Sequence, residues 1–90
     1  MSKLFQAILS LETPDEVERF LRDLCTLGEL EAMAHRWQVA RLLHRHLPYT
    51  EIAEKTGAST ATVTRVAHWL NHGEGGYRIA IDRAKRTASA

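Results

Sequence analysis

The residues best suited to chemistry in this chain are short side chains between positions 59 and 64. Four of them are expected to lie exposed at the start of one helix: Ser59, Thr60, Ala61 and Thr64. Hydroxyl groups can exchange hydrogen bonds with base edges or phosphates, and methyl groups can pack against the methyl group of thymine. None of these side chains can make the bidentate contact that arginine makes with guanine, so bridging water and DNA shape would supply much of the specificity.

The five histidines are the other candidates for chemistry. The i,i+4 pair His68 and His72 and the closer pair His44 and His46 both have spacings that occur in metal sites. No cysteine or carboxylate completes a tetrahedral set near them, so we expect neither a metal nor another cofactor. No nucleophile paired with a base and no pair of catalytic carboxylates stands out, so we expect no enzymatic activity.

A helix-turn-helix in residues 48–70 would position the short side chains. The residues expected on its inner face are Ile52, Ala53, Ala58, Val63 and Val66. Gly57 lies where the first helix must end in a left-handed backbone conformation, and Ser59 lies where the next helix needs an N-cap. This spacing is typical of the unit that places its second helix in the DNA major groove, although an ordinary pair of helices joined by Gly-Ala-Ser is the alternative.

Charge is distributed unevenly along the chain. The net charge is only +1, but residues 1–31 carry three Lys/Arg against seven Asp/Glu, whereas residues 32–90 carry nine against four. The basic part contains the helix-turn-helix, which favours binding to phosphates, although a chance division of solvated faces is the alternative. Lys55 and Arg65 are the basic residues nearest to the short side chains, and for Lys55 a merely solvated position is an equal alternative.

Length and composition indicate one folded domain over residues 1–90. Of the 90 residues, 44% are hydrophobic and 26% are charged, as in ordinary globular proteins. No apolar run is long enough to cross a membrane and no signal-peptide pattern is present, so no membrane partner is expected. The single cysteine, Cys25, excludes an internal disulfide, and we therefore expect a cytoplasmic protein.

The apolar spacing predicts an all-α fold of about six helices. Residues 1–46 are expected to form three of them, the third beginning near Leu27. Their apolar positions are Leu4, Phe5, Ile8 and Leu9; Val17, Phe20, Leu21 and Leu24; and Leu30, Met33, Ala34, Trp37 and Leu43. Thr13 is expected to cap the second helix, because Glu16 is placed for a capping box. Residues 77–86 are expected to form the last helix, after a glycine-rich joint.

Two segments carry a likeness to a known family: Leu30-Glu31-Ala32-Met33-Ala34-His35-Arg36 and Thr56-Gly57-Ala58-Ser59-Thr60-Ala61-Thr62-Val63-Thr64-Arg65. With this order of helices, the chain resembles the tryptophan repressor family, most closely its small YerC/YecD-type members. The resemblance implies an intertwined homodimer, with a shared dimerisation core from residues 1–46 and two projecting helix-turn-helix units. Two such units about 34 Å apart would bind a palindromic operator in double-stranded DNA. The resemblance also places Thr50 at a position that contacts DNA and Thr62 at one near the DNA backbone.

The resemblance further implies a pocket for a small-molecule effector. In the tryptophan-sensing member of the family, the amino acid lies between two arginines, which match Arg36 and Arg65 here. However, Val66 stands where that member has glycine, and Trp69 stands where it has serine. We therefore expect side-chain bulk to occupy the site and tryptophan to bind weakly or not at all, while a differently shaped effector stays open.

Two functions follow from these observations. The first is a sequence-specific DNA-binding regulator of transcription, most simply a repressor that acts as a homodimer. The surplus of large apolar residues between positions 4 and 24 favours the dimer over a monomer that folds back on itself. The second is a helical interaction module whose outer helix contacts a protein such as a polymerase subunit, because that helix is rich in threonine and poor in charge.

Overall fold

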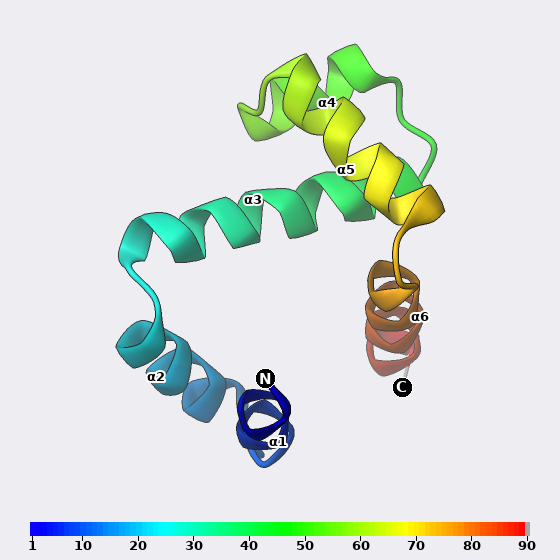
Figure 1. Cartoon of the computed structure of the whole chain (residues 1–90). Helices are drawn as coiled ribbons and strands as arrows, with labels where there is room; N and C mark the ends of the chain where they lie inside the picture. The colour runs from blue at the N-terminus through cyan, green and yellow to red at the C-terminus, as the bar shows by residue number, and fades with distance from the viewer. Residues whose placement is uncertain (90) are drawn as a thin grey trace. The chain divides into compact units, whose positions relative to one another are not determined.

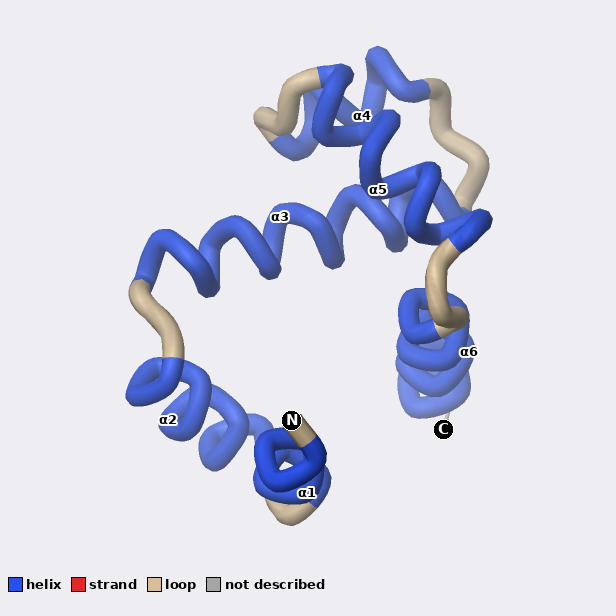
Figure 2. The backbone as a smooth tube through the Cα atoms, in the orientation of Figure 1, coloured by secondary structure: helices blue, strands red, loops and turns tan. Residues whose placement is uncertain are grey.

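Six α-helices make up the part of the chain that the structure describes (Figure 1). This computed structural model describes residues 1–89, and their side chains up to Ala84. The helices are α1 (Ser2–Leu9), α2 (Pro14–Leu24), α3 (Leu27–His44), α4 (Tyr49–Thr56), α5 (Thr60–His72) and α6 (Gly76–Ser89). Figure 2 shows only helices and loops, so the all-α prediction is confirmed over the described range. None of these helices is long and apolar enough to cross a membrane.

Two helix boundaries differ from the sequence-based expectation. The third helix ends at His44 rather than at residue 46, because the backbone then turns through His46 with a left-handed φ of 63°. The last helix covers Gly76–Ser89 and thus extends beyond the expected residues 77–86. Residue 90 lies outside the described residues.

Backbone contacts divide the chain into two compact units. The first unit comprises Met1–Ala32, which contains α1, α2 and the beginning of α3. The second unit begins at Met33 and contains the rest of α3 together with α4, α5 and α6. The helix-turn-helix lies entirely within the second unit.

Threonine residues cap two helices that begin in the first unit. Thr13 Oγ1 accepts a hydrogen bond of 3.1 Å from the backbone N–H of Glu16, as the sequence predicts. Thr26 and Glu29 form a capping box that the sequence analysis did not identify: Glu29 N–H donates to Thr26 Oγ1 (3.1 Å), and Thr26 N–H donates to Glu29 Oε1 (2.8 Å). Hydrogen bonds from Thr26, that of its backbone above all, hold the pKa of the Glu29 carboxyl below its ordinary value.

The apolar stripes of α1 and α2 are not buried within the first unit. Neither helix contains a buried residue. The side chains of Phe5 and Leu9 are 58% and 85% exposed, and those of Phe20 and Leu21 are only half-buried. Several large apolar residues exposed on neighbouring helices are typical of a protein interface.

The core of the second unit joins the C-terminal half of α3 to α4 and α5. Its buried members are Val39, Ala40, Ile52, Val63 and Val66. The inner face predicted for the helix-turn-helix is thus confirmed, with Ala53 and Ala58 half-buried beside it. The apolar side predicted for the third helix is wrong in part, because Val39 and Ala40 are buried whereas Met33 and Ala34 are exposed. The reason is that Val39 and Ala40 are the α3 residues that pack with the buried residues of α4 and α5.

The turn between α4 and α5 depends on Gly57. Its φ is 76°, and its backbone N–H donates to the carbonyl oxygen of Ala53 at 2.9 Å. The Thr56 hydroxyl stabilises the turn through two hydrogen bonds. It donates to the carbonyl oxygen of Ile52 (2.8 Å) and accepts from the N–H of Ala58 (3.1 Å). The left-handed conformation predicted for Gly57 is confirmed.

We predict that Gly57→Ala lowers the free energy of unfolding by about 1 kcal/mol, because alanine is strained in the left-handed region. An added Cβ would meet no atom within 4 Å, so the loss would come from the backbone conformation alone. Gly28→Ala is the matched control, since Gly28 lies in the first turn of α3 and its Cβ would also meet no atom within 4 Å. Alanine is favoured over glycine in helices by up to about 1 kcal/mol, so this control should be neutral or stabilising. Thermal unfolding followed by circular dichroism measures both; equal losses would contradict the prediction.

Candidate nucleic-acid interface

The first turns of α5 present the short side chains that the sequence singles out. Thr60, Ala61 and Thr64 are exposed and share one face, because helical residues three and four apart lie above one another. Val63 and Val66, on the other side of the helix, are buried in the core. The exposed face is therefore held in place by packing on the opposite side of the same helix.

Hydrogen bonds within α5 determine which hydroxyl groups can contact a ligand. Ser59 Oγ accepts from the backbone N–H of Thr62 (3.1 Å) and donates to Thr62 Oγ1 (3.0 Å), so Ser59 is the predicted N-cap. Thr64 Oγ1 donates to the carbonyl oxygen of Thr60 (2.9 Å) and keeps only acceptor capacity. Amino groups of adenine or cytosine would suit an acceptor, whereas the hydroxyl of Thr60, with no partner among the described residues, can donate or accept.

The first helix of the helix-turn-helix carries two more predicted contact residues. Thr50 is exposed in the first turn of α4. Lys55 is exposed on the same helix, and its Nζ lies 3.4 Å from Glu51 Oε1, one turn earlier. Both side chains of this pair are about half exposed, and such pairs contribute little to stability. A phosphate could therefore replace the Glu51 carboxylate at small cost.

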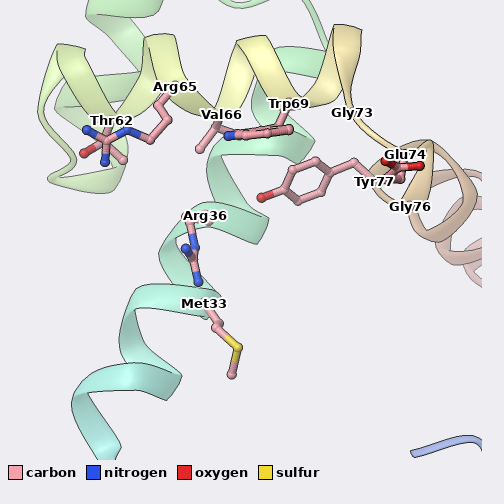
Figure 3. Close-up of a pocket in the computed structure, with 10 residues that line it drawn as sticks. All are labelled: Met33, Arg36, Thr62, Arg65, Val66, Trp69, Gly73, Glu74, Gly76 and Tyr77. Atoms are coloured by element: carbon pink, nitrogen blue, oxygen red, sulfur yellow. The ribbon is translucent and has the colours of Figure 1, made fainter. Parts of the chain in front are cut away.

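A pocket of about 580 Å³ lies beside α5 (Figure 3). It is lined by Arg36 from α3 and by Arg65, Val66 and Trp69 from α5, so the structure brings together the four residues of the predicted effector pocket. Thr62 also lines it, and thus lies on the pocket side of α5 rather than on the face of Thr60 and Thr64.

Other residues of this pocket were not predicted as site residues. They are Met33, Gly73, Glu74, Gly76 and Tyr77. Figure 3 shows Tyr77 pointing from the start of α6 toward α3, and its ring stacks on that of Trp37 with 6.4 Å between centroids. The sequence places Tyr77 only at the start of the expected last helix, and the glycine-rich joint before it is the signal that the chain can turn back at this point.

The side chains of Val66 and Trp69 leave this pocket open in the single chain, and weak binding of tryptophan there stays a prediction. Val66 is only 2% exposed, because it follows Val63 by one turn on the face that packs into the core. Trp69 is 56% exposed and forms part of the pocket wall rather than occupying the space. Arg36, Arg65 and Glu74 are the charged residues among those that line the pocket.

The histidines do not assemble into a metal site in the described part of the chain. No three His, Cys, Asp or Glu side chains there come close enough together to hold an ion. His68 and His72 lie with ring centroids 5.2 Å apart, and His68 also meets Trp69 edge to face at 5.4 Å.

Comparison with known proteins agrees with this geometry. Residues 1–85 match the protein family described as Trp repressor protein. This chain belongs to that family. It is 46% identical over 87 residues to the uncharacterized protein YerC of Bacillus subtilis (strain 168), which covers 97% of this chain and 84% of that protein. A Trp operon repressor homolog of Chlamydia trachomatis serovar L2 is 41% identical over 71 residues, or 73% of this chain and 76% of the homolog.

A solved structure confirms the Trp repressor fold. The crystal structure of a TrpR like protein from Eubacterium eligens ATCC 27750 superposes with a TM-score of 0.89 and 48% identity, covering 93% of this chain and 87% of that chain. The resemblance drawn from the two sequence segments is thereby confirmed. Proteins of the Trp repressor family are DNA-binding regulators of transcription, and the function of this chain is of that class.

We predict that L-tryptophan binds this Trp repressor family member only weakly, because the Trp69 ring stands on the pocket wall where the tryptophan-sensing member has serine. Titration calorimetry should show no saturable binding at micromolar concentrations. Trp69→Ser should bind tryptophan at least tenfold more tightly, whereas Trp69→Phe, which keeps an aromatic ring, should not. Trp69 is more than half exposed, so both variants should fold. A micromolar dissociation constant for the unchanged protein would contradict the prediction.

Proposed function

We propose that this chain is a sequence-specific DNA-binding regulator that acts as a homodimer and represses transcription by covering an operator. The observation that carries the proposal is the exposed face of α5. Thr60, Ala61 and Thr64 bring neither bulk nor negative charge to that face, so the helix backbone could approach base edges closely. Val63 and Val66 hold the helix from its other side.

We assign different roles to the residues of this interface. Thr60, Ala61 and Thr64 contact base edges, and Ser59 sets the start of the helix that carries them. Phosphate contacts are assigned to the remaining predicted residues: Thr50, Lys55, Thr62 and Arg65. Such contacts fix the register of the protein on the duplex but carry no sequence information directly.

The dimer is supported by the first unit. Residues 1–32 contain two helices with no buried residue, and large apolar side chains such as Phe5 and Leu9 face solvent when the chain is alone. Covering them with the same surface of a second copy would bury apolar area on both. Two helix-turn-helix units related by a two-fold axis would then match a palindromic operator.

A protein partner for α5 is the second candidate. It is favoured by the lack of charge on Thr60, Ala61 and Thr64 themselves, and by the pairing of Lys55 with Glu51. The two candidates differ in salt dependence, because a protein that neutralises phosphates loses affinity for DNA steeply as salt rises. Random duplex DNA titrated at several salt concentrations would separate them.

We predict that Ala61→Glu abolishes binding to an operator selected from random DNA, because a carboxylate would face the duplex. The same substitution should not destabilise the fold: Ala61 is exposed in the first turn of α5, where a negative side chain interacts favourably with the helix dipole. Ala61→Ser is the matched control and should retain affinity within a few-fold. Mobility-shift titration and thermal unfolding give the two readouts. Operator affinity of Ala61→Glu equal to that of the unchanged protein would mean that this face of α5 does not contact DNA.

We predict that the protein in solution has twice the 10.2 kDa mass of the chain. Light scattering at micromolar concentration measures this mass. Phe5→Glu should shift the protein toward the monomer, because it places a charge in the apolar stripe of α1, whereas Lys3→Glu alters an exposed residue outside that stripe and should leave the dimer intact. A monomeric unchanged protein, or equal effects of the two variants, would argue against the proposed interface.

A further inference from the structure

A second pocket of the second unit has the composition of an anion-binding site. Its volume is about 380 Å³, and it shares no lining residue with the pocket of Arg36 and Arg65. Leu43, Leu47, Ala67 and Leu70 form its apolar part. The polar lining residues are His44 and His46 at the end of α3, Tyr49 of α4, Asn71 of α5 and Arg78 of α6. Among these described lining residues none carries a carboxylate.

A chain of hydrogen bonds holds the Arg78 side chain at this pocket. Asn71 Nδ2 donates to the carbonyl oxygen of Ala67 at 2.9 Å, which fixes the orientation of the amide. Asn71 Oδ1 is then directed to accept from Arg78 Nη2, also at 2.9 Å. Because the amide is neutral, this bond orients the guanidinium without compensating its charge. A guanidinium has five N–H donors in a fork that matches two oxygens of a phosphate, so most of them remain for a ligand.

The position of His46 is a second observation at the same pocket. The end of α3 has the hydrogen bonds of a Schellman motif: His46 N–H donates to the carbonyl oxygen of Leu43 (2.9 Å), and Leu47 N–H donates to that of Leu42 (3.4 Å). The left-handed residue of this motif is usually glycine, because a Cβ is disfavoured there. Here it is His46, with a φ of 63°, and among the described non-glycine residues it alone has a positive φ. An imidazole is therefore placed at the pocket despite a backbone conformation that favours glycine.

We propose that this pocket binds a phosphate group. The Arg78 guanidinium is its bidentate partner, and the imidazole N–H groups of His44 and His46 and the Tyr49 hydroxyl are further donors. The apolar half of the pocket accommodates an uncharged part of the molecule that carries the phosphate. Two sources share this chemistry: a small phosphorylated molecule, or a phosphodiester of a bound duplex near the start of α4. The proposal does not depend on base recognition by α5.

Titration calorimetry of the full chain with phenyl phosphate and with inorganic phosphate tests the site. For a small-molecule site, phenyl phosphate should saturate one site per chain and bind more tightly than inorganic phosphate, because its ring can use the apolar half. Arg78→Gln should weaken binding at least tenfold. Arg41→Gln is the matched control, since Arg41 is exposed on α3 and does not line the pocket. Equal losses in the two variants would overturn the proposal, because they would indicate a general effect of surface charge.

His46→Gly separates a ligand-binding role from a structural one. Glycine relieves the left-handed backbone, so the midpoint of thermal unfolding should stay the same or rise. Loss of the imidazole should nevertheless weaken phosphate binding several-fold. His72→Gln, at an exposed histidine outside this pocket, should leave binding unchanged. Unchanged affinity in His46→Gly would contradict the assigned role of the imidazole.

The source of the phosphate is decided by a second titration, with duplex DNA. If the phosphate belongs to DNA, free phosphates should not saturate the pocket. Arg78→Gln should then reduce the magnitude of the slope of log affinity against log salt by about one, and Arg41→Gln should not. If the phosphate belongs to a small molecule, the two variants should bind DNA alike while only Arg78→Gln loses phenyl phosphate. The proposal fails if neither phosphate saturates and the DNA titrations of the two variants also coincide.

Discussion

Burial of Val63 and Val66 against Ile52 and Val39 is the interaction on which the rest of the second unit depends. The four side chains come from α3, α4 and α5, so a single apolar cluster holds both helices of the helix-turn-helix against the C-terminal half of α3. Their burial also decides which side of α5 remains exposed. A helix that buries one stripe must present the opposite one, and that stripe contains Thr60 and Thr64.

The single helix α5 carries three of the surfaces described above. Its first turns carry the proposed DNA-contacting face, its middle carries Arg65 and Trp69 on the wall of one pocket, and its last turns carry Leu70 and Asn71 in the other. A ligand in either pocket therefore contacts the same helix that would contact bases. Such a ligand would change the affinity for DNA only if it bound more tightly when α5 is in one position than in another.

The two units differ in how they satisfy their apolar residues. The second unit buries a cluster of its own, whereas α1 and α2 bury nothing completely within one chain. Local hydrogen bonds define where helices of the first unit begin: Thr13 caps α2, and the Thr26–Glu29 box caps α3 at its start in this unit. Caps fix where a helix begins but not what its apolar face contacts. A second copy of the chain supplies that contact in the proposed dimer.

Local chemistry was enough to predict the helices, the left-handed turn at Gly57 and the Ser59 cap, because each depends on residues within a few positions of one another. The family could also be inferred from the segment that contains them. Tertiary packing decided the rest. Val39 and Ala40 are buried only because α4 and α5 cover that part of α3, and Trp69 lines a pocket rather than filling it because Val66 turns α5 into the core. Arg78 is oriented by Asn71 across the joint between α5 and α6. Residues on other helices set these positions, and the spacing of residues along one helix does not reveal them.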